Sequence, residues 1–243
     1  MCTRAVLLFL ITTLSTILPG CAQLPVDEYA VSDTLEKGNR VSYAIVEFVD
    51  KAIARPLAVA YTKVLPYPVQ KGITNVFLNI RTADSSINGL LQGKPKAAGI
   101  DLARILLNTT LGIGGIFDVA APMGLDFQEE DFGQTLAVWG YTRTRYVYFP
   151  IVGPSTVRDL PGALINRILA PPLIVGKHYN FWVGTLDTVS YRAENLPQTD
   201  IRDAAALDPY SFTREAYFQR RKFLIFDGDP PEEDMFDEYF EDE

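Results

Sequence analysis

The side chains that most often carry enzymatic chemistry are sparse in this sequence. Its one histidine, His178, stands between Lys177 and Tyr179, and a lone histidine near aromatic residues is more often structural than catalytic. Ser155 and Asp159 lie close together in "GPSTVRD", but a serine at this place is better explained as a helix cap. The Gly-x-Ser-x-Gly segment of many serine hydrolases is absent. We therefore expect a protein that is not an enzyme.

Metal ligands are equally scarce. The two cysteines, Cys2 and Cys21, lie within or directly after an N-terminal leader, so no thiol remains for a disulfide or a zinc site. The carboxylates of "QEEDF", residues 128–132, lack the spaced ligands of a calcium loop and are expected in a solvated turn. The sequence therefore predicts no metal site and no cofactor.

A glycine cluster is the next candidate for chemistry. Residues 106–125, "LLNTTLGIGGIFDVAAPMGL", contain Gly112, Gly114 and Gly115. Counted from Gly112, the sixth residue is Phe117 instead of the glycine that a dinucleotide-binding loop requires, and no Gly-Lys-Ser/Thr follows. We expect these glycines to turn the chain and to allow close packing.

The first residues have the pattern of a lipoprotein signal. Ala5–Leu18 form an apolar run too short to span a bilayer, and "LPGC" follows directly. This pattern resembles a bacterial lipobox, in which the chain is cleaved before Cys21 and that thiol receives diacylglycerol, with an N-acyl chain added. Ala22, where inner-membrane lipoproteins carry aspartate, favours the outer membrane. We predict a signal peptide over residues 1–20 and a lipidated linker over 21–32.

The charge of the protein lies at its C-terminus. Residues 227–243 contain ten acidic residues and no basic one. Their negative charge is larger than the formal net charge of −8 for the whole chain. Such a run is typical of a solvated, disordered tail, and the alternative is an electrostatic contact with a basic partner. Without a basic stripe, the near-neutral body is not expected to bind nucleic acid.

The body, residues 33–226, reads as one mainly α domain of short, proline-broken helices. Apolar residues recur at helical spacing from Val41 to Ile53, and Pro56 should end or kink that helix. Further helices are expected over residues 73–80, 94–112, 178–196 and 208–226, the last with Asp208 as N-cap. One stretch, Tyr146–Val152, has strand character.

The apolar faces of these helices are wide, and two environments explain them. They form a normal core, or they lie in a membrane interface. No apolar run reaches the roughly 18 residues that a spanning helix needs. On the sequence alone the core is the safer interpretation.

Six blocks follow one another along the body of the chain. They are "DTLEKGNR" (33–40), "ARPLAVAY" (54–61), "NGLLQGKPKAAGIDLARILLNTTLGIGGIFDVA" (88–120), "DFGQTLAVWG" (131–140), "GPSTVRD" (153–159) and "DPYSFTREAYFQRRKF" (208–223). In this order, the blocks resemble the MlaA family, also called VacJ, of outer-membrane lipoproteins. The resemblance covers residues 33–226, with "YTRTRYVY" (141–148) in place of the usual glycine-rich link.

This resemblance implies a ring-shaped helical protein embedded in the inner leaflet of the outer membrane, with an amphipathic channel through the ring. Family members associate with trimeric porins, remove misplaced phospholipid from the outer leaflet, and pass it to a soluble periplasmic carrier. The resemblance thus implies phospholipid transport that maintains lipid asymmetry. The alternative is a structural adaptor that ties a porin or the outer membrane to periplasmic machinery.

Candidate residues follow for the lipid path and for the family motifs. Ile113, Ile116 and Phe117 are expected to pack toward acyl chains or the core of the ring, before Asp118 returns the chain to polar surroundings. Four arginines are candidates to meet a headgroup phosphate, although each is also explained as an ordinary structural residue: Arg104, Arg143, Arg145 and Arg158. The family-motif positions expected to be structural are Asn39, Arg40, Trp139 and Asp159.

Overall fold

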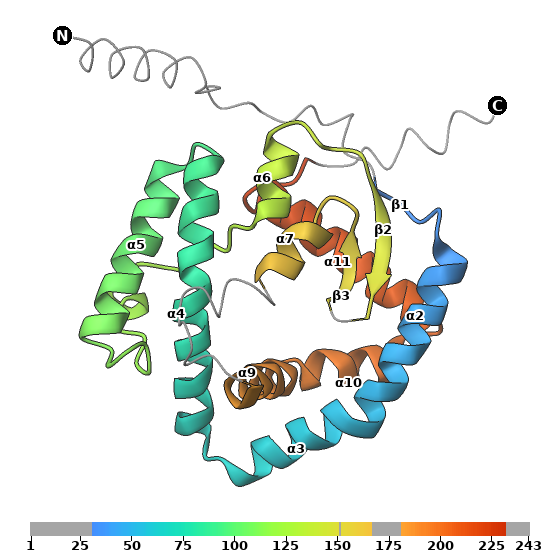
Figure 1. Cartoon of the computed structure of the whole chain (residues 1–243), viewed down its shortest axis with the longest axis horizontal. Coiled ribbons are helices and arrows are strands. Elements are labelled where there is room, and N and C mark those ends of the chain that lie inside the picture. The colour runs from blue at the N-terminus through green and yellow to red at the C-terminus, as the bar shows by residue number, and fades with distance from the viewer. Residues whose placement is uncertain (1–30, 151, 167–180, 232–243) are drawn as a thin grey trace.

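The protein is mainly helical, and its elements are arranged as a ring (Figure 1). The computed structural model describes residues 31–150, 152–166 and 181–231. Its strands are β1 (Val31–Ser32), β2 (Thr144–Phe149) and β3 (Gly153–Thr156). Its α-helices are α2 (Glu36–Val49), α3 (Arg55–Val64), α4 (Tyr67–Leu91), α5 (Pro95–Thr110), α6 (Phe132–Val138), α7 (Leu160–Leu164), α9 (Phe181–Glu194), α10 (Leu196–Ala205) and α11 (Pro209–Ile225).

One bent helical rod forms a long side of the ring. The helices α2 and α3 are joined without a loop by a π-helical segment, Asp50–Ala54 (Figure 1). Pro56 lies in the first turn of α3 and has no N–H to donate to the preceding turn. The π segment widens the helix at this point, so the predicted kink at Pro56 is confirmed.

The opposite side of the ring is the hairpin of α4 and α5. Proline stands in the first turn of both helices, where its fixed φ favours a helix start. The two helices approach closely because Gly89 has no side chain: a Cβ there would lie 3.3 Å from the backbone nitrogen of Ala98. Polar contacts also join them, since the Ser85 hydroxyl donates to Asp101 Oδ2 at 2.5 Å.

A small sheet closes the ring between its two ends. β2 pairs in parallel with β1 and antiparallel with β3, so the predicted strand character of residues 146–149 is confirmed. Ser155 lies within β3 and is buried, so the prediction that it caps a helix is wrong. The sheet packs on an aromatic cluster from β2, α2 and α11, in which Tyr43 and Tyr148 meet edge to face at 5.2 Å.

The last helix, α11, crosses behind the sheet and α7 (Figure 1). It begins as predicted, with Asp208 accepting a hydrogen bond from the Tyr210 backbone nitrogen at 3.2 Å. Just after α11, Asp227 pairs with Lys94, so the acidic segment starts on the folded body. Residues 232–243 lie outside the described residues, and the predicted disorder of the tail stays a prediction.

The segment before α6 corrects another expectation. Glu130 is 6% exposed and pairs with Lys94 at 2.9 Å, while Asp131 accepts the Gln134 backbone N–H at 2.9 Å as N-cap of α6. The predicted solvated turn at "QEEDF" is therefore wrong for these two carboxylates. They are structural because they fix the entry to α6.

Candidate functional site

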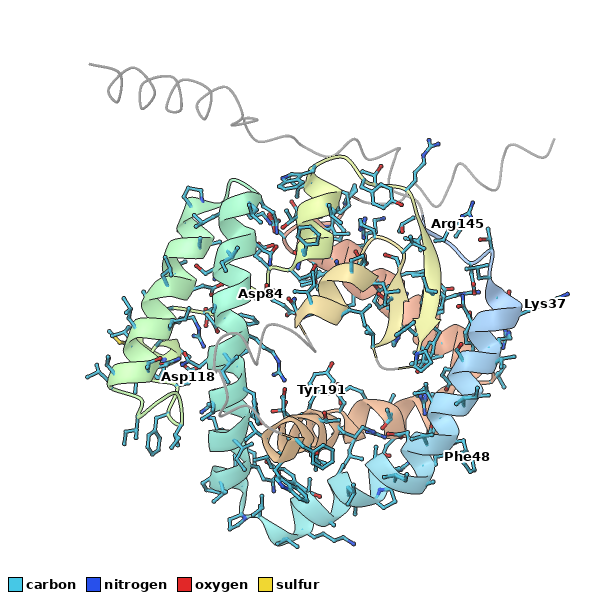
Figure 2. All side chains as sticks on the ribbon, viewed as in Figure 1. Lys37, Phe48, Asp84, Asp118, Arg145 and Tyr191 are labelled. Atoms are coloured by element: carbon cyan, nitrogen blue, oxygen red, sulfur yellow. The ribbon has the colours of Figure 1, made fainter. Side chains whose placement is uncertain are left out.

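The outside of the ring is apolar to a degree unusual for a surface in water. On α2, Val41, Ile45 and Phe48 lie on one stripe, and the Phe48 side chain is 73% exposed and points away from the ring (Figure 2). Val49 and Ile53 continue this exposed set. The interpretation of this stripe as a core face is wrong, because these side chains are exposed. A row of large exposed apolar side chains marks an interaction surface.

The α4–α5 hairpin has the same reversed pattern. Along α5, Asp101, Arg104 and Asn108 are buried, whereas Leu102 and Leu106 are exposed. The polar face of α5 thus turns inward and its leucines turn outward. Among the described residues, no leucine, valine or methionine is fully buried, and apart from Ile225 the interior holds small, aromatic and polar side chains. We call the exposed apolar side chains of α2–α5 the outer apolar face.

Buried polar groups of this kind are stable because they satisfy one another. Arg104 donates from Nη2 to Asp118 Oδ2 at 2.9 Å and from Nη1 to the Leu125 carbonyl. Asn108 donates to the other oxygen of Asp118 at 2.9 Å and accepts the Val119 backbone N–H at 2.9 Å. The network lowers the pKa of Asp118 through hydrogen bonds from Arg104 and Asn108, which outweigh its partial burial.

An apolar groove of about 520 Å³ lies between α3 and α9. Leu57 and Ile53 line one side, and Phe181, Thr188 and Val189 line the other. We call it the α3–α9 groove.

An ion pair between Arg192 and Asp50 lies beside this groove. Arg192, which also lines it, holds Asp50 of the π segment with two bonds of 2.7 and 2.8 Å. The groove therefore combines an apolar wall with a fixed ion pair, as an amphipathic ligand requires.

A polar wall lies on the neighbouring side of α9, toward α4. Asp84 of α4 and Tyr191 of α9 both point into the interior of the ring (Figure 2). Arg81 pairs with Asp187 and lies 5.7 Å from the centre of the Tyr191 ring. We call Arg81, Asp84, Asp187 and Tyr191 the inner polar wall.

Asp84 is the unusual member of this wall. It accepts a hydrogen bond from Asn166 Nδ2 at 2.7 Å, and among the residues that the structure describes it has no cationic partner. Burial raises the pKa of Asp84 to about 6, because water is withdrawn from the carboxylate and no positive charge replaces it.

Of the four candidate arginines, two are occupied inside the protein. Arg104 belongs to the buried network of Asp118, and Arg158 donates from Nε to Asp159 Oδ1 at 2.7 Å with its own side chain fully buried. Arg143 and Arg145 are exposed, and Arg145 lies at the outer rim of the sheet (Figure 2). The structure thus does not bring the four arginines together.

The glycine loop lies outside the ring interior, next to the end of α5. Ile113, Ile116 and Phe117 are all exposed, and Ile116 lies over Gly72 of α4. Gly114 and Gly115 have φ of 69° and 92°, so the expected turning of the chain is confirmed. Ile113 itself adopts a φ of 53°, a left-handed conformation that is uncommon for a branched residue.

Two family-motif residues of α2 hold the N-terminal part of the ring. Asn39 is buried, donates to the Tyr146 carbonyl at 3.1 Å and accepts the Tyr148 backbone N–H at 2.9 Å, which fixes β2 against α2. Arg40 binds both oxygens of Asp208, at 3.2 and 2.7 Å, so α2 is joined to the start of α11.

The other two motif residues differ in their surroundings. Trp139 is 56% exposed and its indole nitrogen donates to the Leu91 carbonyl at 3.0 Å. Asp159 is buried and contacts Arg158, Arg221 of α11 and the Tyr217 hydroxyl. The two arginines hold the pKa of Asp159 down to about 2, although burial acts in the opposite direction. We call Asp159 and these three partners the Asp159 cluster.

Two sequence predictions concern residues outside those described. These are the lipid anchor at Cys21 and the lone histidine, His178. Within the described part of the chain, no group of histidine, cysteine and acidic side chains is arranged to hold a metal ion. Among the same residues, no helix combines the length and the hydropathy needed to cross a bilayer.

Comparison with known proteins decides the family. A family model described as MlaA lipoprotein matches residues 31–224. The chain belongs to the MlaA lipoprotein family. The match covers nearly all of the described ring, from β1 to the last turn of α11.

Curated MlaA relatives extend over most of the chain. The intermembrane phospholipid transport system lipoprotein MlaA of Escherichia coli K12 is 35% identical over 225 residues, 88% of this chain and 87% of that protein. The protein of the same description from Haemophilus influenzae is 31% identical over 235 residues, 93% of this chain and 92% of that protein.

A solved structure shares the MlaA fold. It comes from work on the structural basis for maintenance of bacterial outer membrane lipid asymmetry, with a TM-score of 0.68 and 34% identity. The match covers 80% of this chain and 99% of that one. The expected ring of helices is therefore confirmed by a relative as well as by this structure.

Sequence reasoning missed the inner polar wall and the α3–α9 groove. Arg81, Asp84 and Asn88 follow Phe77 at intervals of three and four residues along α4, so a polar helical stripe was visible in the sequence. The sequence does not indicate that this stripe faces the interior, because its partners on α9 are about a hundred residues away along the chain.

Proposed function

We propose that this protein is an outer-membrane lipoprotein that removes misplaced phospholipid from the outer leaflet and passes it toward a periplasmic carrier. The lipid passes through an amphipathic channel within the ring, and the result is a maintained lipid asymmetry. No bond is made or broken in this process, so the protein is not an enzyme. The descriptions of the MlaA relatives as phospholipid transport lipoproteins support this function.

The single observation that carries the proposal is the reversed packing of the ring. The outer apolar face would cost free energy in water at roughly 25 cal/mol per Å² of apolar surface, and contact with acyl chains removes that cost. The buried polar groups Asp101, Arg104 and Asn108 form hydrogen bonds to Ser85 and Asp118 inside the protein, as a polar group next to hydrocarbon requires. This pattern supports a ring embedded in the inner leaflet.

The interior of such a ring addresses the two barriers of lipid transfer. Exposing an acyl chain to water costs about 0.8 kcal/mol per methylene, or on the order of 10 kcal/mol for one chain. Moving a charged headgroup through hydrocarbon adds a further desolvation cost. The α3–α9 groove offers apolar walls to the chain, and the inner polar wall offers charges to the headgroup.

The remaining parts of the proposal come from the sequence and the family. Acylation of Cys21 would hold the protein to the membrane, and a trimeric porin would surround or flank the outer apolar face. A soluble carrier would receive the lipid on the periplasmic side. A porin fits this face because a lipid-exposed porin wall is itself apolar.

The function is tested in a Gram-negative strain whose own gene of this family is deleted and replaced by the gene for this chain. Outer-leaflet phospholipid is measured on whole cells with a membrane-impermeant amine-reactive probe, together with detergent sensitivity. We expect the deletion to raise both quantities and this chain to restore them. A raised outer-leaflet phospholipid level that this chain does not lower, at normal protein levels, would contradict transport by this chain.

The alternative function, a structural adaptor, requires the ring but not its interior. Thr188→Trp adds an indole to the α3–α9 groove, whereas Leu207→Trp adds the same group at a fully exposed position. A conduit predicts that only Thr188→Trp raises outer-leaflet phospholipid at equal protein levels. An adaptor predicts that both variants complement the deletion equally.

A further inference from the structure

Among the residues that the structure describes, the inner polar wall holds two carboxylates and one cation. Arg81 is paired with Asp187, and Asp84 has no cation among these residues. Counted over these three described side chains, the charge is −1 when all of them are ionised. An excess carboxylate in a partly buried place is costly unless a cation comes to it.

We infer that Arg81 and Asp84 form a headgroup site that selects zwitterionic phospholipid with a primary ammonium, the ethanolamine type, over anionic phospholipid. This inference rests on the proposed function and names the substrate class of that same path. Arg81 would bind the phosphate, and Asp84 would accept hydrogen bonds from the ammonium.

The geometry of α4 suits a ligand with two opposite charges. Arg81 and Asp84 are three residues apart on one helix face, so their Cβ atoms are about 5–6 Å apart. An ethanolamine headgroup carries its phosphate and its ammonium two methylene groups apart, which allows one ligand to meet both side chains. Charge-assisted hydrogen bonds to guanidinium and carboxylate are among the strongest that proteins form.

Arg81 and Tyr191 are exposed beside Asp84, which is itself half-buried. The Arg81 side chain is 44% exposed although it is paired, so a phosphate can reach its remaining N–H groups. Tyr191 is 46% exposed and stands beside Arg81, with its side chain in the interior (Figure 2). Asn166 uses one Asp84 oxygen at 2.7 Å and keeps that carboxylate oriented toward the interior.

The charge balance supplies the selectivity. An ethanolamine headgroup adds no net charge to the wall and brings a cation to Asp84. A glycerol headgroup adds a negative charge with no cation, so it is repelled by Asp84 and Asp187. A choline headgroup carries a positive charge but no N–H, so it cannot donate a hydrogen bond to the carboxylate.

The test uses the full-length protein, purified in detergent and incubated with vesicles that contain equal parts of ethanolamine, choline and glycerol phospholipids with the same acyl chains. The protein is repurified, and its bound lipids are counted by mass spectrometry. We expect the order ethanolamine, then choline, then glycerol. Asp84→Asn should lower the ratio of ethanolamine to glycerol lipid about tenfold, the effect of losing one hydrogen bond to a charged group.

Control variants separate selectivity from folding. Asp126→Asn removes the same charge from an exposed loop and should leave the ratio unchanged. Arg81→Gln should lower retention of all three lipids alike, because the phosphate is common to them. Asn166→Asp adds a second carboxylate beside Asp84 and should raise the ratio, which provides an independent test if Asp84→Asn does not fold.

The outcomes distinguish the two claims. A wild-type protein that retains no phospholipid of any kind contradicts the proposed function. A wild-type protein that retains lipid, with a ratio that neither Asp84→Asn nor Asn166→Asp changes, overturns the headgroup inference alone.

Discussion

The Asp159 cluster provides the most quantitative prediction. Asp159 has a side chain that is 5% exposed and contacts Arg158 Nε at 2.7 Å, the Tyr217 hydroxyl at 2.7 Å and Arg221 Nε at 3.1 Å. The contact with Arg221 Nε is ionic, because the N–H is not aligned with the carboxylate. Asp159→Asn removes the charge while it keeps the size of the side chain.

The expected change in Tm follows from the cost of breaking a buried ion pair and from the size of the domain. Breaking a buried ion pair by neutralising one partner costs about 3–5 kcal/mol, because Arg158 and Arg221 lose a compensating charge. For a domain of this size, a loss of 1 kcal/mol lowers Tm by about 2–4 °C. We therefore expect Asp159→Asn to lower Tm by about 6–20 °C at pH 7.

The same cluster predicts a pH dependence with a definite sign. The pKa of Asp159 falls from its usual 3.8 to about 2 in the folded protein, mainly because Arg221 and Arg158 oppose the effect of burial. A lowered carboxyl pKa stabilises the fold above pH 3.8, and this contribution, about 2.5 kcal/mol, disappears as the pH falls through 2. About 2 kcal/mol of this contribution is lost by pH 2, where Asp159 is half protonated, so the difference in Tm between wild type and Asp159→Asn should narrow by about 4–8 °C between pH 7 and pH 2.

The assay is thermal unfolding followed by circular dichroism, in a nonionic detergent, over pH 7 to 2. Asp126→Asn, an exposed acid in the loop before α6, is the matched control and should melt like the wild type at every pH. A constant difference between wild type and Asp159→Asn across this range would refute the account of the Asp159 cluster.

Three further predictions test the fold and its membrane contact. Asn39→Ala removes two buried hydrogen bonds to the β2 backbone and should lower the unfolding free energy by about 2–3 kcal/mol in denaturant titration, whereas equal midpoints would contradict this role. Gly112→Ala places a Cβ 2.2 Å from a carbonyl oxygen and should lower the free energy of unfolding by about 2–3 kcal/mol. Gly114→Ala, with open space around it, should lower the free energy of unfolding by about 1 kcal/mol. A larger loss for Gly114→Ala than for Gly112→Ala would refute the packing argument. Phe48→Glu, made in a Cys21→Ala background that has no acyl anchor, should weaken flotation with phospholipid vesicles at least tenfold, because a large exposed apolar side chain is lost; unchanged flotation would show that α2 does not meet the lipid.

Local features of the fold could be predicted from the sequence where they depend on neighbouring residues. Asp208 before Pro209 specifies the start of α11 by capping and by the fixed φ of proline. Pro56 specifies a kink because it removes one helical hydrogen bond. Such signals act within one turn and need no knowledge of tertiary contacts.

The orientation of the helices could not be predicted in the same way. The stripe from Val41 to Ile53 has the correct helical spacing, but spacing alone does not distinguish a face toward a core from a face toward lipid. Asp101 and Arg104 on α5 point inward because Ser85 and Asp118 complete their hydrogen bonds, and those partners come from other segments. For the same reason, Ser155 looked like a cap although it lies in a strand whose partner, β2, decides its pairing.

The position of α11 has a consequence for the order of folding. Arg40 contacts Asp208 across 168 residues, and Arg214 contacts Asp33 across 181, so the last helix and its N-cap supply the contacts of longest range. The α4–α5 hairpin depends on local contacts and can form early, whereas closure of the ring must wait until the C-terminal helix has been synthesised. Before closure the chain also exposes aromatic side chains that the ring buries, such as Tyr146 and Tyr210, and is then prone to aggregate.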